Sequence, residues 1–454
     1  MYRVRPAAVA GAFYPGDPRQ LADDLDEMLG GVESIEPRFG FPKALIVPHA
    51  GYIYSGPMAA RAYDELGPAR GVVTRVVLLG PVHRVPVRGL ALPDADAFET
   101  PLGRVPVDAQ AAQQLAGLAQ VVISGPAHAM EHSLEVQLPF LQRVLGQFSL
   151  VPFAVGDASA QQVAQVAERL WGGRETLFVV STDLSHYHAY EESRRIDAAT
   201  AAQIEAFATD IDHEQACGAT PLNGVLRVAR AKGLAMRRLG VCNSGDTAGG
   251  KGRVVGYGAF ALDEAGSADA AEAGRTLIAI ARQSIRRRLD PAAAAPDTRH
   301  AAWLEQPGAV FVTLMLDGRL RGCIGSLEAH RPLGEDVAAN AEAAACRDPR
   351  FPPLTAAEWP RCEVEVSLLS RAKPIAYADE EDLLEQIRAG EDGIVLEHGG
   401  RRATFLPQVW QGLPDKRAFL GELVKKAGLP ADTRLARCKV SRYRVKKWVQ
   451  GPMQ

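Results

Sequence analysis

Histidines follow three apolar, strand-like segments in the first half of the chain. "LIVPHAG" places His49 after such a run, "VVLLGPVH" places His83 there, and "FVVSTDLSH" places His186 there. In parallel α/β sheets, ligands collect at the edge formed by the carboxyl ends of the strands. Three histidines on that one edge can converge, and His49 lies where a ligand would lie. Each histidine alone could simply be hydrogen-bonded at a strand end, but three recurrences among only ten histidines favour a shared site.

Three further polar residues could take part in the same site. "EHSLEVQLPF" contains His132 and Glu135, which are three positions apart and can face the same direction on a helix. They could support the ligands or contact a substrate; alternatively, His132 lies near the helix cap and Glu135 interacts with the helix dipole. Asp183 of "STDLSH" could orient a histidine tautomer, as carboxylates do at metal sites, or could cap a helix.

Two cysteines have neighbours that could make them reactive. Cys217 of "ACGATPLNGVL" precedes the predicted start of a helix, which could stabilise a thiolate and make it a soft metal ligand. Cys323 of "RLRGCIGSL" lies between glycines with Arg321 close by, which is compatible with a nucleophile or a ligand-gripping thiol. Either residue could instead be a buried structural thiol, and no histidine base lies near Cys323 in the sequence.

The elements that would position the first site are apolar segments alternating with helical patterns. Strands are predicted at 43–48, 75–81, 150–156 and 176–182, and helices at 107–118 and 159–171. Continuous apolar strands separated by helices are typical of a parallel sheet that is covered on both faces. We therefore predict an α/β domain with a mainly parallel sheet over residues 1–264.

The composition changes at "LDEAGSADAAEAG", residues 262–274, where small and acidic residues dominate. We expect a linker at 265–271 and a second domain at 272–454. This second part contains two hairpin signals, Asp317-Gly318 and Gly399-Gly400, together with an alternating strand pattern. Helices are predicted at 333–346 and 416–427, so we predict an α+β domain.

The overall composition restricts the classes of function. The chain has 454 residues and a formal net charge of -3, which gives no general attraction for nucleic acid. No run approaches the roughly 18 apolar residues of a membrane span, and the six cysteines include no C-x-x-C pair. We expect a cytoplasmic protein that binds no membrane. The basic ending at 434–448 could contact nucleic acid, but a solvated face is the favoured interpretation.

The motifs of the first part resemble, in order over about residues 5–262, those of the Memo family, which is related to the class III extradiol dioxygenases of LigB-like fold. The resemblance implies metal ligation by His49, His83 and Cys217, with His186 in the position of the dioxygenases' acid/base histidine. Tyr52 is grouped with His132 and Glu135 as supporting or substrate-contacting residues. The dioxygenases have a carboxylate as third ligand. We expect Fe(II), although a thiolate also suits copper or zinc.

The second part resembles the AMMECR1 family over about residues 272–449, through "LRGCIGS", "RDPRFPPLT", "GIVLEHGGRRATFLPQVW" and "LVKKAGL". This resemblance implies a fold and a candidate cleft around Cys323 and Arg321, without a defined reaction. In prokaryotes the two families occur together with a radical S-adenosylmethionine protein, in the AmmeMemoRadiSam grouping. The present chain has no C-x3-C-x2-C run for such a cluster, so the radical enzyme is expected to be a separate partner.

Two functional hypotheses follow. In the first, the chain is a mononuclear, dioxygenase-like metal oxidoreductase in which His186 and Asp183 assist catalysis, and the AMMECR1-like domain handles an unknown small-molecule or protein substrate. In the second, the chain is a non-catalytic metal-binding adaptor for the radical enzyme. Direct RNA binding by the second domain rests on the basic ending alone and is the weakest interpretation.

Overall fold

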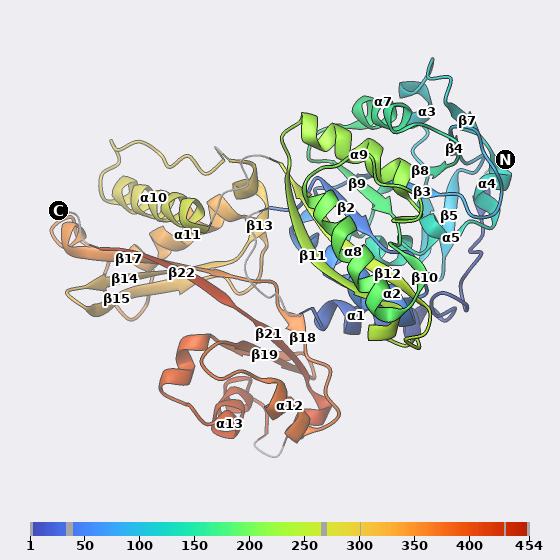
Figure 1. Ribbon diagram of the computed structural model, residues 1–454. Helices are drawn as coiled ribbons and strands as arrows, with labels where there is room; N and C mark the ends of the chain where they lie inside the picture. Colours follow the sequence, from blue (N-terminus) through green and yellow to red (C-terminus); the bar gives the residue numbers. More distant parts are fainter. Residues whose placement is uncertain (1–2, 33–39, 265–269, 300, 431–432, 452–454) are drawn as a thin grey trace. The chain divides into compact units, whose positions relative to one another are not determined.

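The computed structural model describes residues 3–32, 40–264, 270–299, 301–430 and 433–451. Residues 3–32 and 41–264 form one compact unit, and residues 270–451 belong to a second unit (Figure 1). Most of the expected linker, 265–269, lies outside the described residues, and helix α10 (Ala270–Leu289) begins directly after them. Among the described helices, none combines the length and the apolar character that a membrane crossing requires.

Four parallel strands form the centre of the sheet in the first unit. Their order is β2 (Ala44–Val47), β9 (Thr176–Ser181), β3 (Arg75–Pro81) and β8 (Ser149–Val155). They coincide with the four predicted apolar segments, and nearly all of their residues are buried. Their carboxyl ends therefore share one edge, as the sequence predicts.

Both flanks of this sheet contain antiparallel pairs. On one side β12 (Val254–Asp263) lies antiparallel to β2 and also pairs with β10 (His186–His188) and β11 (Ala235–Asn243). On the other side β4 (Leu90–Leu92) lies antiparallel to β8 and parallel to β7 (Val121–Ile123). The sheet is therefore mixed, and the prediction of a mainly parallel sheet describes its centre only.

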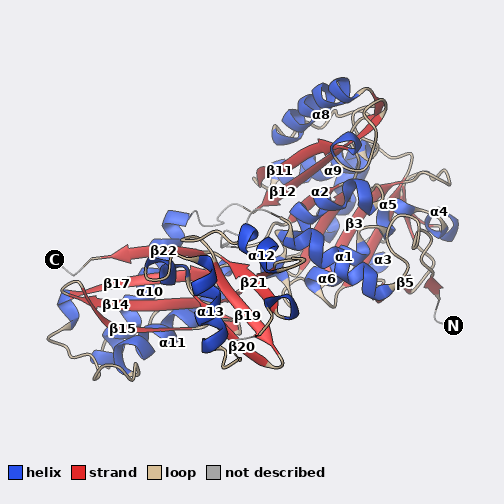
Figure 2. Ribbon diagram, turned by 90° about the horizontal axis from the view of Figure 1, so that it is seen from below, coloured by secondary structure: helices blue, strands red, loops and turns tan. Residues whose placement is uncertain are grey.

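Helices cover both faces of this sheet (Figure 2). One apolar core joins the sheet to α1 (Pro18–Gly30), α2 (Tyr52–Asp64) and α6 (Leu138–Leu145). A second core joins the opposite face to α7 (Ala160–Leu170), α8 (Tyr190–Glu205) and α9 (Ala219–Ala231). Shorter helices are α3 (Ala111–Gln114), α4 (Gly125–Ala129) and α5 (His132–Glu135). A small sheet contains β1 (Val4–Arg5), β5 (Ala97–Thr100) and β6 (Gly103–Pro106).

The second unit contains two antiparallel four-stranded sheets. The first has the order β15 (Arg319–Gly325), β14 (Val310–Leu316), β17 (Cys362–Leu369) and β22 (Val445–Gln450), and it packs on α10 and α11 (Leu333–Cys346). The second has the order β18 (Lys373–Pro374), β21 (Lys439–Tyr443), β19 (Gly393–His398) and β20 (Arg401–Phe405). Helix α13 (Lys416–Lys426) packs against this second sheet, and α12 (Glu380–Gln386) joins the same apolar core. The sheet-rich composition agrees with the α+β prediction.

Two glycine-containing turns connect hairpins of these sheets. Asp317 and Gly318 join β14 to β15 with φ of 50° and 76°, and Gly399 and Gly400 join β19 to β20 with φ of 56° and 76°. Positive φ at both positions matches the twist of paired strands.

The remaining elements are short. One is the two-stranded pair of β13 (Pro307–Gly308) with β16 (Arg331–Pro332). Short 3-10 helices lie at Gly67–Ala69, Ser244–Asp246, Ala302–Glu305, Trp359–Arg361, Pro407–Gln411 and Leu435–Arg437.

Candidate metal centre

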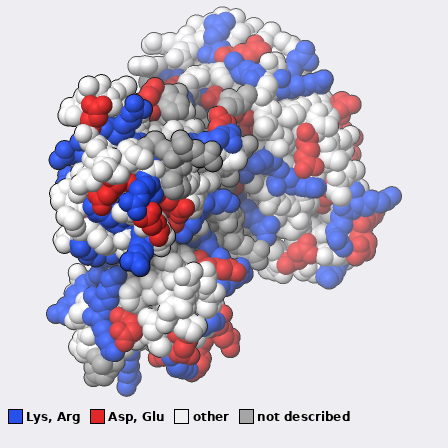
Figure 3. All heavy atoms as spheres, turned by 90° about the vertical axis from the view of Figure 1, so that its left-hand side faces the viewer, with Lys and Arg blue, Asp and Glu red and all other residues white. Residues whose placement is uncertain are grey.

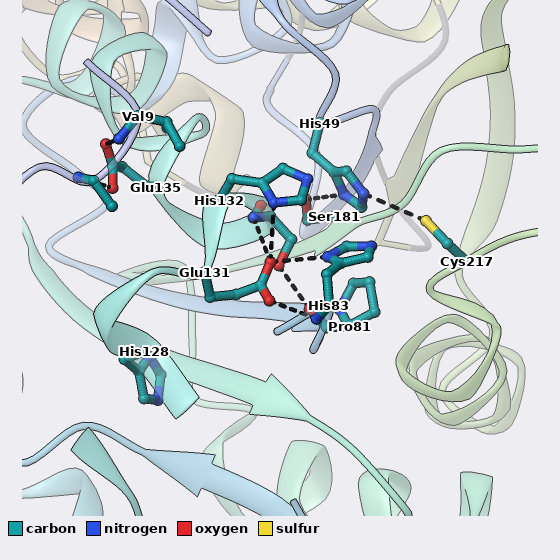
Figure 4. Close-up of polar contacts among 12 residues, drawn as sticks. Val9, His49, Pro81, His83, His128, Glu131, His132, Glu135, Ser181 and Cys217 are labelled. Atoms are coloured by element: carbon teal, nitrogen blue, oxygen red, sulfur yellow. Dashed lines mark hydrogen bonds and ion pairs between the residues drawn. The ribbon is translucent and has the colours of Figure 1, made fainter. Parts of the chain in front are cut away.

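Three histidine side chains meet at the carboxyl edge of the central sheet. His49 follows β2, His83 follows β3, and His132 begins α5. One potential ligand atom from each residue lies within 4.8 Å of the others (Figure 4). Two nitrogens bound to one metal ion at about 2.1 Å lie roughly 3–4 Å apart, so a small contraction would bring all three onto one ion. The sequence expectation joined His49 and His83 to Cys217, whereas the structure groups them with His132.

The hydrogen bonds of His49 define which of its nitrogens is free. The ring is buried, and its Nδ1 lies 2.9 Å from Ser181 Oγ. Ser181 uses its only proton in a 2.6 Å hydrogen bond to the carbonyl of Ser133, so Nδ1 of His49 must be the donor to Oγ. Its Nε2 therefore carries the lone pair that a metal ion needs. Burial, followed by the neighbouring imidazoles, lowers the pKa of His49 well below its usual value, which keeps the ring neutral.

Glu131 holds the second histidine in the same manner. Its buried carboxylate accepts hydrogen bonds from the His83 backbone N–H at 2.6 Å and from His83 Nδ1 at 2.9 Å. Burial alone would raise the pKa of Glu131, but the hydrogen bonds from His83 and the Ser133 amide hold it at about 2. The carboxylate is thus ionised and can only accept. Nδ1 of His83 is therefore protonated, and its Nε2 is available to an ion.

His132 shares the same carboxylate. Its Nδ1 lies 3.4 Å from Glu131 Oε1, and its ring centroid lies 4.6 Å from that of His83 and 5.5 Å from that of His49. Burial lowers the pKa of His132 to about 4, so this ring is also neutral. The sequence placed His132 among supporting residues and did not single out Glu131. The only local signal for Glu131 is an acidic residue directly before that histidine.

Close packing brings α5 onto β3. A Cβ atom built on Gly80 of β3 would lie 2.8 Å from Ser133 Oγ and 3.0 Å from Leu134 Cδ2. Ser133 Oγ also donates a 2.8 Å hydrogen bond to the carbonyl of Pro81. The absence of a side chain at position 80 therefore allows the helix that carries His132 to approach the strand that precedes His83.

Cys217 contacts the cluster from outside. Its Sγ lies 3.3 Å from His49 Nε2 and accepts a hydrogen bond from the Asp183 backbone N–H at 3.3 Å. Burial raises the pKa of the Cys217 thiol to about 12, so the thiol is protonated in this structure. Its metal ligation remains a prediction, in which the thiol loses its proton to the bound ion.

Asp183 is placed differently from either expectation. Its carboxylate accepts the His49 backbone N–H at 2.7 Å, so it fixes the main chain and does not orient an imidazole or cap a helix. Burial raises the pKa of Asp183 to about 7.

His186 is half-buried at the start of β10. It interacts electrostatically with His49 and His83 from outside the three-histidine cluster. Burial lowers the pKa of His186.

Tyr52 and Glu135 lie in structural networks. Tyr52 Oη donates to the carbonyl of Val136 at 2.7 Å. Glu135 is fully buried, pairs with the Arg5 guanidinium and accepts a 2.6 Å hydrogen bond from Tyr14 Oη. It also accepts the amides of Ala8 and Val9 at 2.8 and 3.0 Å. Although only three positions separate Glu135 from His132, its carboxylate anchors the N-terminal segment and does not join the histidines.

The second unit contains the other two sequence candidates. Cys323 lies on β15, where Thr313 Oγ1 donates a hydrogen bond to its Sγ at 3.3 Å. Arg321 is buried and engaged with the Glu358 carboxylate at 3.0 and 3.1 Å and with the carbonyl of Pro352 at 2.9 Å. Its guanidinium thus secures a neighbouring loop. The structure provides no direct contact through which Arg321 would activate Cys323.

Fold and site together define a two-domain protein: an α/β unit with a candidate three-histidine metal site at its sheet edge, followed by a sheet-rich unit. Residues 5–261 match the family of Memo-like proteins, and residues 278–448 match AMMECR1. The chain belongs to the Memo-like protein family and carries an AMMECR1 domain in the same polypeptide.

Several MEMO1 family proteins are similar to the first part of this chain. A MEMO1 family protein of Aquifex aeolicus is 36% identical over 271 residues, which cover 56% of this chain and 97% of the relative. One from Aeropyrum pernix is 36% identical over 276 residues, covering 56% and 98%. A solved structure of an uncharacterised protein from Pyrococcus horikoshii is 34% identical, covers 39% of this chain and 92% of its own, and has a TM-score of 0.36.

Proposed function

We propose that the chain is a mononuclear metal-dependent oxidoreductase of dioxygenase-like type, with Fe(II) as its ion. The observation that carries this proposal is the convergence of three imidazoles, with Nδ1 of His49 and of His83 engaged by acceptors. Neutral imidazole is a good ligand for iron, copper and zinc. When bound, an iron ion would supply the redox chemistry. The protein's contribution is to hold the ligands in the correct tautomer and to exclude water around His49.

The half-buried His186 is the proposed proton-transfer group. It lies close enough to His49 and His83 to influence them electrostatically. Its lowered pKa favours the neutral ring, which can accept a proton from a substrate hydroxyl and later return it. We propose that the substrate is a small molecule or a modified protein, and that a radical S-adenosylmethionine enzyme acts as a separate partner.

One observation favours a second candidate function, that of a non-catalytic metal-binding adaptor. Non-haem iron oxygenases of the common type bind iron with two histidines and one carboxylate. Here the carboxylate of Glu131 is engaged by His83, and the third member of the cluster is an imidazole. Such a set also suits zinc, which has no redox chemistry. The identity of the native metal therefore separates the two proposals.

The decisive experiment is anaerobic metal analysis of natively purified protein and its variants. We expect about one iron per chain, most of it lost in His49→Ala and His132→Ala. His186→Ala should keep the metal but lose oxygen consumption with candidate substrates. Full metal content in His49→Ala would refute the site, and loss in Cys217→Ala with retention in His132→Ala would restore the ligand set expected from the sequence. Bound zinc without redox activity would support the adaptor.

A further inference from the structure

A basic hollow lies on the second sheet of the second unit, at the hairpin formed by β19 and β20. Its volume is about 420 Å³. The residues that line it are Glu397, His398, Gly399, Gly400, Arg401, Arg402, Arg437 and Lys439. They come from the hairpin and from β21 with its preceding turn, so distant parts of the sequence contribute cations to one concave surface.

The cations of this hollow are mostly uncompensated. Arg402 pairs with Glu397 at 2.9 Å and with Glu328. Across the described part of the chain, by contrast, no carboxylate lies within 4.0 Å of the charged groups of Arg401, Arg437 or Lys439. Figure 3 shows that Lys and Arg are mixed with Asp and Glu over much of the face it presents. The three unpaired cations of the hollow therefore form a group within a surface that carries both signs of charge.

The register of the sheet explains why these cations converge. Glu397 lies opposite Arg402 on one side and opposite Lys439 on the other, and His398 lies opposite Arg401. Nδ1 of His398 also donates a hydrogen bond to the carbonyl of Arg437 at 3.0 Å, which fixes the turn that carries this arginine. The single carboxylate in the row, that of Glu397, pairs with Arg402 and forms no ion pair with Lys439.

The basic C-terminal segment is consequently not uniform. Arg444 pairs with Glu391 and lies 3.1 Å from Asp392, and Lys447 pairs with Glu365 at 2.8 Å. These later cations are neutralised within the fold. Arg437 and Lys439 line the hollow, and no described carboxylate forms an ion pair with either of them.

We propose that this hollow binds the phosphate groups of a small phosphorylated molecule. Guanidinium groups bind phosphate oxygens in a bidentate manner, and lysine adds a compact charge. The volume suits a ligand of nucleotide size or smaller. The two turn glycines place no side chain in the opening. No phenyl, phenol or indole ring lines the hollow, so base stacking of the kind used for single-stranded nucleic acid is not provided.

The test is calorimetric titration of the full-length protein with inorganic pyrophosphate at low ionic strength. We expect saturable binding at one site, weakened by added salt because the contacts are electrostatic. The double variant Arg437→Ala/Lys439→Ala should bind at least tenfold more weakly. The matched control is Arg417→Ala/Lys425→Ala, which removes two exposed cations of α13 that are paired with glutamates, and it should bind like the wild type.

Three results would overturn the proposal. The first is the absence of pyrophosphate binding to the wild-type protein. The second is equal pyrophosphate affinity of the wild type and the Arg437→Ala/Lys439→Ala variant, when circular dichroism shows that the variant is folded. The third is an oligonucleotide that binds more tightly with increasing length while pyrophosphate competes poorly. That third result would assign the hollow to nucleic acid instead of a small ligand.

Discussion

At the residue scale, the decisive side chain of the metal centre is one that would not itself bind the metal. Glu131 accepts hydrogen bonds from the backbone and ring of His83 and lies 3.4 Å from Nδ1 of His132. One ionised carboxylate thereby fixes the direction of His83 and is shared by His132. Groups that orient metal ligands in this way commonly contribute about 10–100-fold to metal affinity.

We predict that Glu131→Gln keeps the fold but weakens metal binding by about 10–100-fold. The amide can donate a proton toward Nδ1 and so favours the tautomer with the lone pair on the wrong nitrogen. Competition titration with a chromophoric chelator would measure the change. Glu135→Gln is the matched control, because Glu135 anchors the N-terminal segment; it should lower stability and leave metal affinity nearly unchanged. Equal metal affinity in Glu131→Gln and wild type would show that Glu131 has no orienting role.

The sequence identifies part of this site for a clear physical reason. His49 and His83 follow strands of one parallel sheet, so their proximity follows from topology alone. His132 comes from α5, and its approach depends on contacts of Ser133 and Leu134 with β3 that no local pattern encodes. Glu131 likewise contacts both His83 and His132, which lie far apart in the sequence. Such tertiary contacts cannot be deduced from residue types and spacing.

At the element scale, the central strands are the most predictable part of the fold. Each is a short apolar run that is buried on both faces, which is the pattern of a parallel strand. The sheet edges are less predictable, because β12 pairs with β2 from a distant part of the chain. The helix predicted at 107–118 is reduced to α3, Ala111–Gln114. The apolar residues that give this segment its helical periodicity include Ala111 and Leu115, which belong to the apolar core on one face of the sheet.

Helix α4 contains a histidine that should make the fold sensitive to acid. His128 is buried, its Nε2 donates to the Ala91 carbonyl of β4 at 2.8 Å, and its Nδ1 has no hydrogen-bond partner. Burial lowers its pKa from the usual value of about 6.5 to about 4. Above pH 6.5 the ring is neutral in both the folded and the unfolded chain, so its titration does not change the free energy of unfolding. Below this pH the unfolded chain takes up the proton first, so stability falls until about pH 4.

We predict that His128→Gln loses less stability than wild type between pH 7 and pH 5. The difference should be about 2 kcal/mol, from the separation of the folded and unfolded pKa values. Urea denaturation at the two pH values would measure it. His330→Gln, which changes an exposed histidine, should follow the wild-type curve. The same acid slope in wild type and His128→Gln would contradict the assignment.

At the scale of the whole molecule, the described residues form separate apolar cores in the two units. Those of the first unit flank the central sheet, and those of the second lie on its own two sheets. The histidine cluster belongs to the first unit and the basic hollow to the second. A ligand of either site should therefore stabilise one unit at a time.

We predict two calorimetric unfolding transitions, of which added Fe(II) under anaerobic conditions raises only one. At a free metal concentration of 100 times Kd the gain is about 2.7 kcal/mol, which corresponds to a shift of roughly 5–10 °C for a unit of this size. His49→Ala should abolish the shift and leave the other transition in place. A single transition, or a metal-dependent shift of both, would show that the units unfold together.

The pairing of β12 with β2 has a consequence for the way this polypeptide acquires its structure. The register joins Phe260 to Ile46, so the strand that leads to His49 has to wait for more than two hundred further positions to be synthesised before its neighbour on that side exists. Contacts of such long range slow folding. On the ribosome, the sheet whose edge carries these imidazoles can therefore be completed only after nearly all of the first unit has emerged.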